Sequence, residues 1–155
     1  MKYLLVIDMQ EDYVGSARNK KQYPYKEEVL IDRVNQKILE YPKENVIYIT
    51  NKFFYERANK TKKLVDGLMV VSDFVFEKRK SDCFSNKALL QFLQDKKVTE
   101  LELVGVDGNY CVKASAKSGV LHGFAVTMYL PAVGVANQKK FEKTKQGLTK
   151  AGVKF

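Results

Sequence analysis

Short apolar runs alternate along the chain with longer stretches in which apolar residues recur every three or four positions. Most of the runs are rich in β-prone residues and do not alternate with polar ones, which is typical of parallel strands whose two faces are both covered. The runs predict main strands over the following ranges: Tyr3 to Ile7, Asn45 to Thr50, Phe74 to Glu77, Leu101 to Val106 and Phe124 to Leu130.

The stretches between these runs have helical periodicity and recognisable ends. One helix is predicted over Lys26 to Tyr41, ended by Pro42, and a second after a Ser85 N-cap. Cys111 opens a third helix, and Asn137 caps a terminal helix that stops at Gly152. Two weaker features are possible short extended pieces: Leu68 to Val71 and Val153 to Phe155.

Strands that alternate with helices predict an α/β fold, a three-layer α/β/α arrangement around a mostly parallel sheet of five to six strands. The length of 155 residues and the 45% hydrophobic content suit one domain over residues 1–155. The N-terminal apolar run ends at Asp8 and is too short for a signal peptide or a membrane span. We therefore expect a cytoplasmic protein with no membrane partner.

The net charge of +9 raises the hypothesis of an anionic partner such as nucleic acid. The lysines are scattered, however, and short groups such as Lys60-Thr61-Lys62-Lys63 resemble solvated loops or helix faces. No nucleic-acid motif accompanies them, so we expect no nucleic-acid partner. The two cysteines, Cys83 and Cys111, sit in no metal-ligand spacing, and a reducing compartment argues against a disulfide.

Three residues that carry chemistry follow predicted strands directly. Asp8 ends the first strand, Lys78 follows the third, and Cys111 begins the helix after the strand that ends at Val106. The carboxyl ends of parallel strands are where α/β folds bind ligands. At a helix N-terminus the positive end of the dipole favours a thiolate, the nucleophilic form of cysteine. Taken alone, Asp8 could equally cap a turn, and Cys111 could be a buried hydrophobe.

The chain resembles the isochorismatase-like cysteine hydrolases, a superfamily with a Rossmann-like fold that includes nicotinamidases and N-carbamoylsarcosine amidohydrolase. Three stretches carry the resemblance: residues 4–12 (LLVIDMQED), 76–84 (FEKRKSDCF) and 105–112 (GVDGNYCV). The resemblance implies an Asp8-Lys78-Cys111 triad in which Cys111 attacks a carbonyl carbon and forms a thioester-type intermediate. Asp8 would shuttle protons, and Lys78 would hold both groups by its charge.

The resemblance also implies a cis peptide between Val106 and Asp107, with the N–H groups of Asp107 and Cys111 forming an oxyanion hole. It implies a homodimer or homotetramer as well. We expect the substrate to be a small molecule, planar or partly apolar, lying against aromatic side chains. The candidate substrate-binding residues are Tyr13, Phe53, Phe54, Tyr55, Phe84 and Tyr110.

The chain departs from the family at several positions. Nicotinamidases carry an Asp-x-His metal site after the second strand, where this chain has Asn51-Lys52-Phe53, and its only histidine, His122, lies near the end of the Cys111 helix. We therefore expect neither metal nor cofactor. Gly108 stands where a threonine is common, and Pro131 stands where an Asp often follows the fifth strand.

Three functions are consistent with these motifs. The first is a metal-independent cysteine hydrolase that cleaves a C–N bond of a small amide or carbamoyl compound. An isochorismatase-type vinyl-ether hydrolase would depend on Asp8 but not on the covalent Cys111. A binding or assembly protein would keep the fold without turnover.

Overall fold

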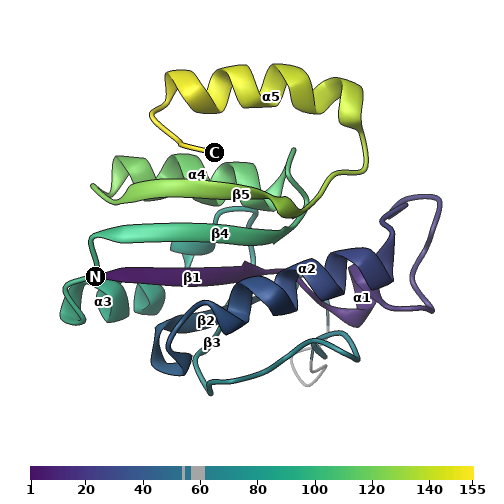
Figure 1. Cartoon of the computed structure of the whole chain (residues 1–155), viewed down its shortest axis with the longest axis horizontal. Coiled ribbons are helices and arrows are strands. Elements are labelled where there is room, and N and C mark those ends of the chain that lie inside the picture. Colours follow the sequence, from purple (N-terminus) through teal and green to yellow (C-terminus); the bar gives the residue numbers. More distant parts are fainter. Residues whose placement is uncertain (54, 57–61) are drawn as a thin grey trace.

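The computed structural model describes residues 1–53, 55, 56 and 62–155. Within these residues five strands form a single sheet in the order β3-β2-β1-β4-β5, and every pair of neighbours is parallel (Figure 1). The strands are β1 (Lys2–Ile7), β2 (Val46–Asn51), β3 (Val75–Lys78), β4 (Glu100–Val106) and β5 (Ala125–Gly134). The parallel α/β fold predicted from the alternating runs is confirmed.

Helices cover both faces of the sheet. The helices are α1 (Glu11–Val14), α2 (Glu27–Leu39), α3 (Lys87–Asp95), α4 (Cys111–Leu121) and α5 (Gln138–Lys150), with 3₁₀ turns η1 (Lys43–Asn45) and η2 (Cys83–Ser85). One apolar core lies between the sheet and α1 and α2, and a second lies between the sheet and α3, α4 and α5. The three layers of the prediction are therefore present (Figure 1).

Burial on both faces explains why apolar and polar residues do not alternate along β1. Leu4 and Val6 point into the core beneath α2, whereas Leu5 and Ile7 point into the core beneath α3 and α4, and all four are fully buried. Successive side chains of a strand face opposite sides, so a strand buried on both sides must be apolar throughout.

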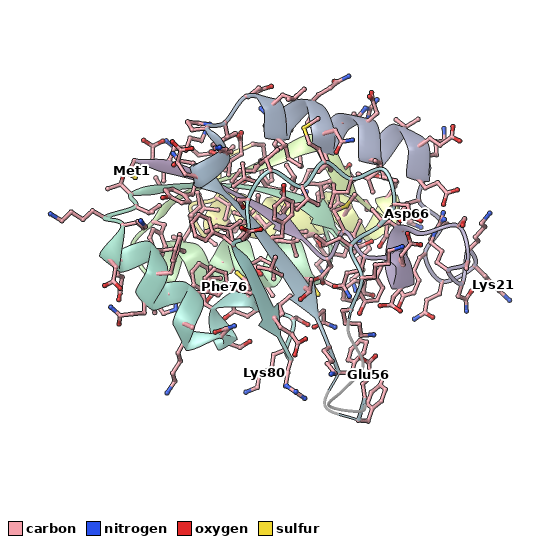
Figure 2. All side chains as sticks on the ribbon, turned by 90° about the horizontal axis from the view of Figure 1, so that it is seen from below. Met1, Lys21, Glu56, Asp66, Phe76 and Lys80 are labelled. Carbon is pink, nitrogen blue, oxygen red and sulfur yellow. The ribbon has the colours of Figure 1, made fainter. Side chains whose placement is uncertain are left out.

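The strand order fixes where a site can form. Strand β1 lies at the centre, and the chain places β2 on one side of it and β4 on the other. The loops that leave the carboxyl ends of β1 and β4 therefore turn towards opposite faces, which is the position where open α/β sheets bind ligands. In Figure 2, Lys21, Glu56 and Asp66 lie towards the end of the molecule away from Met1, among the segments that follow the carboxyl ends of β1 and β2.

Gly105 allows β1 and β4 to approach each other at the end of their pairing, where Ile7 lies opposite Gly105. Its φ is +112°, and a Cβ built on it would lie 2.0 Å from the carbonyl oxygen of Ile7. Only glycine tolerates that backbone conformation together with that contact. The pairing of β4 with β5 shifts register between Leu103 and Gly105, so the irregular end of β4 begins just before the turn that leads to Cys111.

Several local predictions are wrong. The N-cap of α3 is Asn86, whose side chain accepts from the Ala88 N–H, while Ser85 belongs to the preceding 3₁₀ turn. Residues 153–155 form a single bridge between Lys154 and Thr127 instead of a sixth strand. The strand expected to end at Leu130 continues through Pro131 to Gly134, while residues 68–71, a possible extended piece, belong to no helix or strand.

Two further observations concern charge and membranes. Lys62 was expected in a solvated loop, but its side chain is only 4% exposed and forms ion pairs with Asp12 and Glu56. A buried ammonium needs such partners because it has lost its water. In the part of the chain that the structure describes, no helix has both the length and the apolar character needed to cross a membrane.

Candidate active site

Asp8 lies at the carboxyl end of the central strand. Its backbone turns sharply there, with a φ of 53°, and its N–H donates to the carbonyl of Ile49. The side chain is buried, and Oδ2 accepts a hydrogen bond from Lys78 Nζ at 3.0 Å. Oδ1 is buried too and has no hydrogen-bond partner among the described residues. Lys78 thus fixes Oδ2 of Asp8, and Oδ1 is the oxygen that can accept a proton.

Lys78 is the last residue of β3 and is one of the most deeply buried side chains of the protein. Its ammonium has three hydrogens and contacts three acceptors. These are Asp8 Oδ2 at 3.0 Å, Asn51 Oδ1 at 3.0 Å and Cys111 Sγ at 3.3 Å. Every donor of this buried cation is therefore satisfied, which is what burial of a charge requires.

Asn51 ends β2, the strand between those of Asp8 and Lys78, and it holds the ammonium from a third side. Its Nδ2 donates to the Tyr13 hydroxyl at 3.0 Å, so its Oδ1 must face Lys78. The main chain of Asn51 exchanges two hydrogen bonds with the buried side-chain amide of Gln10. Neither Asn51 nor Gln10 was identified from the sequence, although a polar residue at the carboxyl end of a buried strand is the same signal that identified Asp8.

Cys111 is the first residue of α4, as predicted. The carbonyl of Asp107 accepts from the N–H groups of Tyr110 and Val112, which fixes the start of the helix around the cysteine. The first N–H groups of a helix have no acceptor within the helix, so the N–H of Cys111 is available to a ligand. The sulfur lies beside Lys78, and the structure thus brings Asp8, Lys78 and Cys111 together.

The protonation of the site differs from the thiolate expected at the helix N-terminus. Burial, and then the negative charge of Asp8, raise the pKa of Cys111 to about 12, while Lys78 acts in the opposite direction. Burial also raises the pKa of Asp8, and Lys78 again opposes the rise. One cation therefore faces two groups that could be anions, and burial raises the pKa of both of them.

The turn between β4 and α4 contains the cis peptide expected from the resemblance, between Val106 and Asp107. Asn109 is fully buried in this turn, where it bonds to the carbonyl of Asn137 and to the hydroxyl of Thr144. Gly108 packs so closely on the same region that an added Cβ would lie 2.9 Å from Phe141. Val135 and Val133 lie similarly near, at 2.9 and 3.1 Å, so a larger side chain at this position would require these neighbours to shift.

The predicted substrate-binding residues occupy different environments. Tyr13 contacts Asn51, while Phe53 and Tyr55 form an exposed stacked pair with ring centroids 5.3 Å apart. Tyr110 is exposed beside Cys111. Phe84 is only 6% exposed and packs on Phe124, among core residues. Its position fits a core side chain better than a pocket wall. Phe54 lies outside the described residues.

Two tyrosines of the loop before α2 were missed by the sequence analysis. Tyr23 packs edge-on against Tyr13 at 5.2 Å, and its pKa is raised by burial and then by the charges of Tyr55 and Asp12. The Tyr25 hydroxyl donates to Asp107 Oδ2 at 2.8 Å. Both lie in a polar segment with no hydrophobic periodicity, so no pattern along the chain indicated that they approach the site.

The positions of the family's metal site hold side chains that do not suit a metal. Asn51 is bonded to Lys78, Lys52 is a buried lysine, and Phe53 has no donor atom. His122, the C-cap of α4, packs near Phe84 with ring centroids 5.1 Å apart. In the described ranges no group of three or more His, Cys, Asp or Glu side chains could hold a metal ion.

Ionisable side chains gathered at the carboxyl edge of a parallel sheet are typical of α/β proteins that bind or convert small molecules there. The chain belongs to the isochorismatase family of hydrolases, because the family model of the isochorismatase domain matches residues 2–153. This match confirms the family that the three sequence stretches resemble and the hydrolase class that they imply.

Solved structures of similar fold include three named hydrolases. N-carbamoylsarcosine amidase from Thermoplasma acidophilum has a TM-score of 0.79 at 16% identity, covering 99% of this chain and 95% of that one. The Staphylococcus aureus nicotinamidase has a TM-score of 0.75 at 19% identity, covering 99% and 97%. The Pyrococcus horikoshii pyrazinamidase, in complex with zinc, has a TM-score of 0.72 at 21% identity, covering 99% and 97%. No curated protein sequence matches the chain.

Proposed function

We propose that this protein is a metal-independent cysteine hydrolase that cleaves the C–N bond of a small amide or carbamoyl compound. The observation that carries the proposal is the position of the Lys78 ammonium, 3.0 Å from Asp8 and 3.3 Å from Cys111. The Lys78 ammonium lies beside both Asp8 and Cys111, so it can stabilise a negative charge on either of them. A charge that moves from the Asp8 carboxylate to the Cys111 sulfur therefore stays close to the same cation. That arrangement suits a proton transfer between Cys111 and Asp8.

The first half of the reaction forms a thioester. The thiol proton of Cys111 moves to Asp8 while the sulfur attacks the carbonyl carbon, and the carbonyl oxygen takes the negative charge. We assign the N–H groups of Asp107 and Cys111 to that oxyanion. Asp8 then gives its proton to the leaving nitrogen, the C–N bond breaks, and the acyl or carbamoyl group stays on the sulfur.

The second half releases the product with the same three residues. Asp8 takes a proton from water, the oxygen of that water attacks the thioester carbon, and the carbon–sulfur bond breaks. The proton held by Asp8 returns to the sulfur, so Cys111 ends as a thiol and Asp8 as a carboxylate. The sum is an amide plus water giving an acid plus an amine. The aromatic residues Tyr13, Phe53, Tyr55 and Tyr110 support a small, planar or partly apolar substrate.

The test is turnover of a panel of small amides and carbamoyl compounds by the wild type, Cys111→Ala and Cys83→Ser. Cys83 is a free, fully buried cysteine bonded to Ser115 through its main chain, so its serine variant is the matched control. We expect ammonia or amine release by the wild type and Cys83→Ser, and none by Cys111→Ala. Activity that survives in Cys111→Ala but needs Asp8 would contradict the proposal and favour vinyl-ether cleavage. A wild type without turnover on the panel would favour a binding protein.

A further inference from the structure

The carboxylate of Asp107 is buried directly beside the cis peptide and accepts three hydrogen bonds. Oδ1 accepts from the Asn109 N–H at 2.7 Å. Oδ2 accepts from the Ala136 N–H and from the Tyr25 hydroxyl, both at 2.8 Å. The proposed reaction gives this carboxylate no chemical step, yet the main chain of the same residue supplies one of the two N–H groups assigned to the oxyanion. The side chain of Asp107 thus fixes the turn that presents that N–H.

Tyr25 is the one side chain among these three donors, and Arg18 holds the loop that carries it. The guanidinium of Arg18 donates to the carbonyls of Gly15, Tyr23 and Tyr25 at 3.0, 2.8 and 2.6 Å. It also pairs with Glu27 at the start of α2. One buried cation thereby gathers both ends of the loop between α1 and α2 and fixes the direction in which Tyr25 points.

We propose that Tyr25 is a positioning residue for the oxyanion-binding turn. The inference rests on the proposed function, because it assigns the Asp107 N–H to the oxyanion. Hydrogen bonds to a carboxylate are stronger than those between neutral groups, so the Tyr25 hydroxyl contributes to the orientation of Asp107. In Tyr25→Phe the Asp107 carboxylate keeps its two main-chain donors, so the turn persists. The orientation of Asp107 nevertheless loses the restraint that the Tyr25 hydroxyl provided.

We expect Tyr25→Phe to weaken the stabilisation of the oxyanion in the transition state and to leave the binding of the substrate unchanged. Loss of an oxyanion donor lowers kcat by about 100- to 1000-fold in other enzymes. Loosening a donor that remains in place should cost less, and we expect a decrease in kcat of about 10- to 100-fold for Tyr25→Phe, with KM within about twofold of the wild type. A tyrosine that only stabilised the fold would not separate kcat from KM.

Tyr41 supplies a matched control. Its hydroxyl donates to Glu102 Oε2 at 2.5 Å, so it too is a tyrosine bonded to a buried carboxylate. Glu102 lies in the first half of β4, whereas Asp107 follows the end of the same strand. Tyr41→Phe removes a hydroxyl from a buried carboxylate that keeps Lys2 and Lys37 as partners, and it should leave kcat unchanged.

A second measurement does not depend on turnover. An aldehyde adds to a cysteine by forming a carbon–sulfur bond, with the thiol proton passing to Asp8 and the negative charge to the former carbonyl oxygen. Acetaldehyde and benzaldehyde would be the probes, and protection of Cys111 from iodoacetamide in a Cys83→Ser background would give their affinity. We expect Tyr25→Phe to weaken protection about tenfold and Tyr41→Phe to match the wild type.

The outcomes separate the two proposals. Wild-type affinity and kcat in Tyr25→Phe, or equal decreases in both tyrosine variants, would overturn the role of Tyr25. Aldehyde protection that depends on Tyr25, without turnover of any amide, would support the positioning role and overturn amide hydrolysis. If neither aldehyde protected the wild-type cysteine, the oxyanion site itself would be contradicted, and the role of Tyr25 with it.

Discussion

The ammonium of Lys78 lies 3.3 Å from the sulfur of Cys111, although the two residues belong to elements on opposite sides of β1. Lys78 ends β3, two strands from β1 on one side, and Cys111 follows β4 on the other. The contact exists because the lysine side chain is long enough to extend past the end of β2 to Asp8. It makes the ionisation of the thiol depend on a distant strand.

The first prediction concerns the thiol pKa. Asp8 raises the pKa of Cys111 and Lys78 lowers it, so the two substitutions should act in opposite directions. Alkylation by iodoacetamide in a Cys83→Ser background should titrate far above the ordinary cysteine value of about 8.5. Asp8→Asn should move the midpoint down, and Lys78→Met should move it up. A wild-type midpoint below the ordinary value would contradict this account.

The second prediction concerns activity in acid. Asp8 must be ionised to accept the thiol proton, and burial raises its pKa above the ordinary value of 3.8. As pH falls through that raised pKa, Asp8 becomes protonated and kcat/KM should fall. The acid limb of kcat/KM, measured for the free enzyme, should therefore have its midpoint above pH 3.8. A profile that stays flat down to the ordinary value would exclude Asp8 as the base.

The third prediction concerns Asn51. Asn51→Ala removes an acceptor from the buried Lys78 ammonium, a contact of a type that contributes about 1.5–3 kcal/mol. We expect a decrease in kcat/KM of roughly 10- to 150-fold. Asn35→Ala is the control, since Asn35 also makes two side-chain bonds, to Gly67 and Met69. Equal activity in the two variants would show that Asn51 has no role in holding the lysine.

The fourth prediction compares the effects of two glycine-to-alanine substitutions on the free energy of unfolding. Gly105→Ala would place a methyl group against the Ile7 carbonyl at a positive φ, so we expect it to unfold at much lower denaturant than the wild type, or not to fold. Gly147 lies in α5 with open space around its Cα, and Gly147→Ala should raise the free energy of unfolding by about 0.5–1 kcal/mol. Urea unfolding followed by circular dichroism would measure both, and a mild effect at Gly105 would contradict the close approach.

The sequence predicted the parts of the site that follow from strand ends. Asp8, Lys78 and Cys111 each adjoin a strong apolar run, and parallel pairing brings such positions to one edge. Tyr25 could not be predicted in this way, because its contact with Asp107 spans 82 residues and depends on the fold of an irregular loop. The upward shift of the Cys111 pKa also required the structure, since the net effect of burial, Asp8 and Lys78 depends on their distances.

The placement of Lys78 has one consequence for the stability of the site. Strand β3 has four residues, pairs only with β2 within the described sheet, and forms the edge of that sheet. Edge elements of this kind detach locally at a lower free energy than the rest of a domain. Detachment of β3 would move the Lys78 ammonium away from Asp8 on β1 and from Cys111 on α4. The proposed chemistry at the centre of the sheet therefore depends on the pairing of one short edge strand with β2.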